Sequence, residues 1–194
     1  MFNNRIKKHK LAYKNIKKAE KYNNGRFEDL FDIKSMILAM TKDYDFVITN
    51  VNEEISNCSQ DSVLITLKKL KFNILYSFGH FNKVVNQVSR LRENGNQDKY
   101  LLHLRALSYL ALGKFEKAKQ DLQEFNHPFF YDINMILLNL LKGNKNKAIQ
   151  YYSNLNMTKA ELYNSQNFQD LIFMISPYKP FKKLLTDFIE SRPE

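Results

Sequence analysis

The sequence has 194 residues, of which 44% are hydrophobic, and its 30 Lys and Arg against 20 Asp and Glu give a formal net charge of +10. A chain of this length and hydrophobic content can bury a core. The lack of any apolar run of about 18 residues excludes a transmembrane helix. The basic N-terminus does not resemble a secretory signal. A single cysteine, Cys58, excludes an internal disulfide framework, so we expect a cytoplasmic protein.

The positive charge is concentrated at the N-terminus. Residues 1–26 hold nine basic side chains and one acid, Glu20, whereas the remaining residues are nearly neutral. Apolar residues recur at steps of three or four over residues 4–22, which predicts a lysine-rich helix, and Asn23-Asn24-Gly25 is typical of a helix end. We therefore expect a basic N-terminal helix within residues 1–26 and a helical repeat domain over residues 27–194.

Apolar residues continue at helical spacing along the rest of the chain. Asp98 is placed to open one helix, and Asn126-His127-Pro128 to end another. Thr158 with Glu161 resembles a capping box, and Pro180 suits the first turn of a closing helix. No strand-like alternation persists, so the expected fold class is all-α. The predicted helices cover residues 30–40, 43–56, 63–76, 81–91, 98–110, 115–125, 133–141 and 147–155.

A glycine recurs between paired amphipathic helices at Gly79, Gly113 and Gly143, with spacings of 34 and 30 residues. Repetition at this period favours a solenoid of helical hairpins. An ordinary helical bundle is the alternative, since short loops and antiparallel helices are common to both.

The unit around Gly113 resembles the tetratricopeptide-repeat (TPR) signature of small, aromatic and glycine positions, through Ala106, Tyr109, Gly113, Phe115 and Ala118. The units around Gly79 and Gly143 match in part, since Val84 and Lys145 depart from the pattern. The resemblance covers roughly residues 28–156. It implies a TPR-like solenoid of about four hairpins, followed by C-terminal capping helices.

Motifs for catalysis or for cofactor and metal binding are lacking. His9, His80, His103 and His127 are scattered, and none is spaced with Cys58 as a zinc site. The sequence has no phosphate-binding glycine loop and no nucleophile elbow. We therefore expect no enzyme, no metal and no cofactor.

In peptide-binding TPR proteins, the first helices of each pair line a concave groove. Carried over to this chain, the resemblance implies a groove lined by Lys69, Asn73, Tyr76, His103, Leu107 and Leu110. Lys69 and Asn73 match half of the family's carboxylate clamp, but Leu104 stands where an asparagine would be needed. The leading hypothesis is a non-catalytic adaptor or scaffold that binds a protein or peptide partner.

The basic arm supports a rival hypothesis of nucleic-acid binding through phosphates. Its lysines alternate with Tyr13 and Tyr22, and the shortage of arginine argues against base-specific contacts. An anionic membrane could attract the same helix, or the helix could only cap the solenoid. A peptide-sensing regulator, in which ligand binding moves the arm, is a third interpretation, and the oligomeric state is left open. The candidate phosphate contacts are Arg5, Lys7, Lys8, Lys10, Lys14, Lys17, Lys18 and Lys21.

Overall fold

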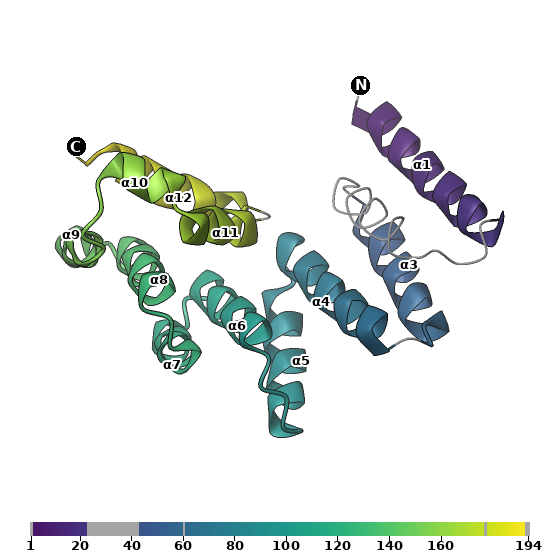
Figure 1. Cartoon of the computed structure of the whole chain (residues 1–194), viewed down its shortest axis with the longest axis horizontal. Coiled ribbons are helices and arrows are strands. Elements are labelled where there is room, and N and C mark those ends of the chain that lie inside the picture. Colours follow the sequence, from purple (N-terminus) through teal and green to yellow (C-terminus); the bar gives the residue numbers. More distant parts are fainter. Residues whose placement is uncertain (1, 23–42, 60, 177, 193–194) are drawn as a thin grey trace. The chain divides into compact units, whose positions relative to one another are not determined.

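The computed structural model describes residues 2–22, 43–59, 61–176 and 178–192 (Figure 1). Within them the chain forms eleven helices and contains no strand, which confirms the all-α class. The expected helix over residues 30–40 and the expected boundary after residue 26 lie outside the described residues. The chain divides into two compact units, Met1–Ile74 and Leu75–Glu194.

The first unit contains α1 (Phe2–Tyr22), α3 (Tyr44–Asn57) and most of α4 (Asp61–Ser77). The side chain of Asp43 caps α3 by accepting a hydrogen bond from the Phe46 backbone N–H at 3.0 Å. Tyr13 attaches α1 to α3. Its side chain is buried, and its ring meets Phe46 edge-on with 5.8 Å between centroids.

The second unit consists of helical hairpins followed by three more helices. Gly113 and Gly143 form the turns of two hairpins whose helices pack against each other, and Gly79 lies in a turn of the same kind after α4; all three have a positive φ between 68° and 78°. Glycine adopts this left-handed conformation without the steric cost that a Cβ imposes. The turns predicted at these glycines are therefore confirmed, and the predicted hairpins are confirmed at Gly113 and Gly143. The helices are α5 (Phe81–Glu93), α6 (Lys99–Ala111), α7 (Phe115–Phe125), α8 (Pro128–Leu141), α9 (Lys145–Asn154), α10 (Lys159–Asn164), α11 (Gln166–Ile175) and α12 (Lys179–Glu190).

Two predicted helix starts are confirmed by their hydrogen bonds. Asp98 accepts from the Leu101 backbone N–H at 3.2 Å. The capping box is complete, because Thr158 accepts from the Glu161 N–H at 3.2 Å and the Glu161 carboxylate accepts from the Thr158 N–H at 2.8 Å. Such caps satisfy N–H groups that have no partner within the helix.

Two boundaries differ from the prediction. Pro128 ends the preceding pair as expected but also opens α8, five residues before the predicted start, because proline needs no N–H partner in a first turn. Ser165 divides the helix predicted after Thr158 into α10 and α11. Its hydroxyl accepts from the Phe168 N–H at 3.2 Å and so caps α11.

The first helices of the α6–α7 and α8–α9 hairpins are buried on all sides. In α6, nine of thirteen residues are buried. In α8 the buried run is continuous from Ile133 to Asn139, about two helical turns, and so covers the whole circumference. Four helices pack against α8, namely α7, α9, α11 and α12 (Figure 1). The C-terminal helices therefore cover a side of α8 that an open solenoid would leave exposed.

Candidate partner-binding surfaces

Four of the six predicted groove residues lie in the core of the second unit. Tyr76, His103, Leu107 and Leu110 are each at most 2% exposed. The Tyr76 ring packs against Phe81 and against Tyr178, which immediately precedes α12. Here the structure differs from the predicted open groove, because helices distant in sequence return to cover the hairpins. These four side chains stabilise the fold and are not available to a partner in this conformation.

The other two predicted groove residues, Lys69 and Asn73, are half-buried on the part of α4 that belongs to the first unit. The predicted set is thus divided between the two units.

His103 is part of a buried polar pair in the second unit. Its Nε2 lies 2.9 Å from the Asn134 side-chain nitrogen, which also donates to the Phe130 carbonyl at 2.6 Å. Burial lowers the pKa of His103 to about 4, so its imidazole is neutral near pH 7. The His103 Nδ1 and the Asn134 Oδ1 have no hydrogen-bond partner among the described residues. The pair is enclosed in the core and has no access to substrate.

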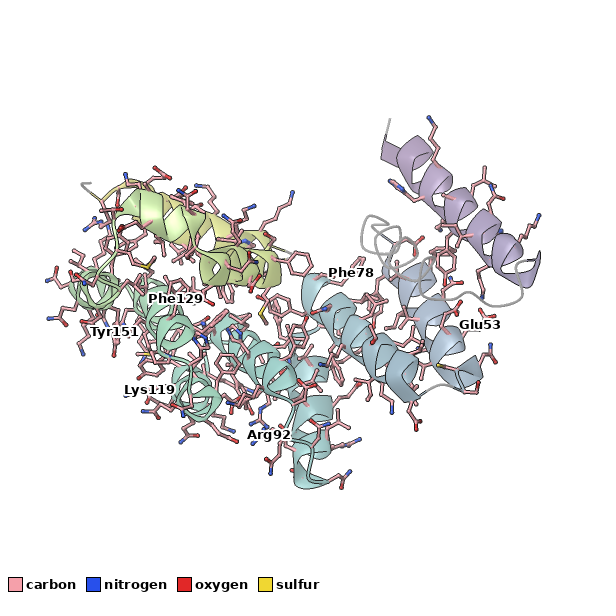
Figure 2. The ribbon with its side chains drawn as sticks, viewed as in Figure 1. Glu53, Phe78, Arg92, Lys119, Phe129 and Tyr151 are labelled. Atoms are coloured by element: carbon pink, nitrogen blue, oxygen red, sulfur yellow. The ribbon has the colours of Figure 1, made fainter. Side chains whose placement is uncertain are left out.

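A second buried polar contact holds three helices together. Arg105 of α6 donates two hydrogen bonds to the Asp121 carboxylate of α7, at 2.8 and 2.7 Å, and a third to Ser89 of α5 at 3.0 Å. Burial raises the pKa of Asp121, whereas the hydrogen bonds and positive charge of Arg105 oppose that rise. At the surface Arg92 of α5 pairs with Glu124 of α7 (Figure 2). The geometry is that of a structural clamp.

An open hollow of about 250 Å³ lies at the junction of α7 and α8. Pro128 is exposed there, and Asn126 adopts a left-handed conformation with φ 52°. Tyr131 meets Tyr151 of α9 edge-on, with 6.3 Å between ring centroids (Figure 2). Burial and the neighbouring Tyr151 raise the pKa of Tyr131, so its hydroxyl stays protonated. The hollow is lined by Leu122, Gln123, Asn126, His127, Pro128 and Tyr131.

The described lysines of α1 fall into a paired and an unpaired group. Lys10 pairs with Asp43 at 2.5 Å, and Lys17 pairs with Glu53 of α3 at 3.1 Å. These two predicted phosphate contacts are therefore already engaged with carboxylates.

Other lysines of α1 are exposed. Lys8, Lys14 and Lys18 are exposed and form no ion pair with the described residues, and Leu11 between them is 59% exposed. The side chains of Arg5, Lys7 and Lys21, also predicted to contact phosphates, lie outside the described ones.

Sequence reasoning missed the hollow, although one signal for it was present. Asn126-His127-Pro128 was interpreted only as a break between helices. A tight turn of this kind can leave space beside the helix ends that it joins. Gln123 and Tyr131 gave no separate signal, because an exposed glutamine and a half-buried tyrosine are ordinary on helix surfaces.

Comparisons with known proteins give no match: no family model, no curated protein and no solved structure is similar to this chain. In the ranges that the structure describes, no three histidine, cysteine or acidic side chains gather as a metal site. None of the described helices has the length and apolar character needed to cross a bilayer.

Proposed function

We propose that this chain is a non-catalytic adaptor that binds a protein or peptide on the outer surface of a TPR-like array of helical hairpins. Repeated hairpins with glycine turns of one conformation support this, because such arrays present extended surfaces to their partners. The observation that carries the proposal is the hollow between α7 and α8, which lies outside the buried core.

The size and lining of the hollow fit a peptide side chain. Pockets for cofactors and drug-sized ligands are about 300–1,000 Å³, so a hollow of about 250 Å³ suits one or two side chains. Pro128 provides apolar contact at the surface, while Gln123, Asn126 and Tyr131 provide groups that can hydrogen-bond a peptide backbone. An extended partner segment could place an apolar residue in the hollow and continue along α7 or α8.

The test is to fill the hollow with bulk. Gln123→Trp places an indole in the hollow, and Gln150→Trp adds the same indole at an exposed position of α9 outside its lining. The full chain and both variants are used to capture proteins from the native host's lysate after nuclease treatment. We expect Gln123→Trp to lose a protein that the wild type and Gln150→Trp retain. Equal capture by all three folded proteins would refute a partner site in the hollow.

The exposed face of α1 supports a second candidate function, association with nucleic acid. Lys8, Lys14 and Lys18 are exposed and form no ion pair with the described residues, so phosphates can reach them without breaking the ion pairs of Lys10 and Lys17 to α3. Contacts of this kind depend on charge and not on base sequence.

Salt dependence distinguishes this function from the adaptor. Three lysine–phosphate contacts predict that the logarithm of affinity falls with the logarithm of salt concentration with a slope of about −2 to −3. Lys8→Gln, Lys14→Gln and Lys18→Gln together should remove that dependence for a single-stranded DNA probe. Binding that is unchanged in the triple variant would contradict the role of α1.

A further inference from the structure

The lysines of the second unit gather at two neighbouring hairpin turns. Residues 114–119 and 142–147, around Gly113 and Gly143, contain six lysines and one acid, Glu116. The two turns lie side by side, since Lys142 pairs with Glu116 at 3.1 Å and its Nζ lies over the Phe115 ring, 5.1 Å from the ring centroid. We call the exposed surface they form the turn surface, consisting of Lys114, Lys117, Leu141, Lys142, Lys145, Lys147 and Ile149.

Most of this charge is not neutralised within the molecule. Only Lys142 has an acidic partner among the described residues. Lys117 lies over the Tyr109 ring at 6.0 Å, a contact that leaves its charge in place. Lys114, Lys145 and Lys147 are exposed and take part in no ion pair that the described structure contains.

Folding does not account for these lysines. Lys145 and Lys147 lie in the first turn of α9, and Lys114 and Lys117 lie at the start of α7. The N-terminal end of a helix carries a partial positive charge, which favours acidic residues there and disfavours lysine. Residues that oppose helix stability at two adjacent helix starts are better explained by a partner that brings negative charge.

We propose that the turn surface binds an acidic protein segment that also carries apolar side chains. This rests on the proposed adaptor function and names the chemistry of its partner. Charge complementarity calls for acidic residues. Leu141 and Ile149 are each 36% exposed among the lysines and offer contacts to aliphatic side chains. A phosphate backbone would leave these two side chains without a partner, so the surface favours an acidic peptide over nucleic acid.

The experiment titrates the full chain with a fluorescent peptide of glutamate and leucine and follows anisotropy at physiological salt. One variant combines Lys114→Gln, Lys145→Gln and Lys147→Gln. Its matched control, Lys68→Gln, Lys99→Gln and Lys182→Gln, removes the same charge from exposed positions outside the turn surface. We expect the turn variant to bind about tenfold more weakly, as three exposed ion pairs imply, and the control to bind as the wild type does. Urea midpoints establish that both variants fold.

A second comparison separates the two classes of partner. The double variant Leu141→Ser with Ile149→Ser should weaken peptide binding by about threefold, since each substitution removes only a partly exposed apolar contact. The proposal is overturned if the two lysine variants weaken peptide binding equally, or if the peptide does not bind. It is also overturned if single-stranded DNA binds the turn surface more tightly than the peptide does. A lysate protein captured equally by wild type and turn variant also overturns it, but leaves the adaptor function in place. Capture of no protein after nuclease treatment refutes the adaptor function, and with it the protein partner proposed for the turn surface, even where the model peptide binds.

Discussion

His103 gives a quantitative test of whether the first helices of the hairpins are core. Sequence reasoning placed this residue in an exposed groove, whereas its side chain is 1% exposed and its pKa is lowered to about 4. In the unfolded chain the imidazole regains a pKa near 6.5. Between these values the unfolded state binds a proton and the folded state does not. The contribution of His103 to the free energy of unfolding is therefore fully present above pH 6.5 and is lost as the pH falls towards 4.

The size of this loss follows from the two pKa values. Each unit of difference corresponds to about 1.4 kcal/mol, so His103 should lower the free energy of unfolding by about 3 kcal/mol between pH 7 and pH 4. His103→Gln removes the titrating group and keeps a side chain that can hydrogen-bond to Asn134. The variant will be less stable overall, but its stability should depend less on pH than that of the wild type.

Urea unfolding of both proteins at several pH values measures this difference. Carboxylates titrate in both proteins alike and cancel in the comparison, which isolates the contribution of His103. His9→Gln, which removes an imidazole from the first unit, controls for the loss of a histidine elsewhere. If wild type and His103→Gln show the same pH dependence, His103 is accessible to water and the assignment of α6 to the core is wrong.

Three further substitutions test other parts of the fold by urea unfolding. Leu107→Ala should lower the free energy of unfolding by about 3 kcal/mol because the side chain is fully buried. Leu141→Ala, at the exposed end of α8, should lower it by less than about 1 kcal/mol. Equal losses would argue for an open groove. Gly113→Ala should lower the free energy of unfolding by about 1–2 kcal/mol because alanine is strained at this positive φ, while nothing lies within 4 Å of the added Cβ. An unchanged free energy of unfolding would refute that turn conformation. Asp121→Ala should cost about 3 kcal/mol by leaving Arg105 without its carboxylate, and a loss below about 1 kcal/mol would show that the clamp is open in solution.

Local signals predicted most of the helices of the second unit. Gly113 and Gly143 fix their turns through their own backbone conformation, and Asp98 and Thr158 cap helices through neighbours three residues away. These interactions lie within a few residues of sequence, so the sequence shows them directly. Pro128 was interpreted in only one of its two roles, because the same residue ends one segment and opens the next.

The candidate site was harder to predict because burial depends on contacts distant in sequence. Leu107 and Tyr76 follow a helical pattern whether their outer side faces solvent or another helix. The packing of α11 and α12 on α8, and of Tyr178 on Tyr76, decides between these cases. The lysines around Gly113 and Gly143 were visible in sequence, but only the contact of Lys142 with Glu116 shows that they form one surface.

The most direct test of the adaptor function is capture from the native host's lysate by the full chain, with and without nuclease. We predict that a discrete protein is retained after nuclease treatment and is lost with Gln123→Trp but not with Gln150→Trp. Loss of all bound material on nuclease treatment would contradict the adaptor function. It would instead assign binding to nucleic acid and to the exposed lysines of α1.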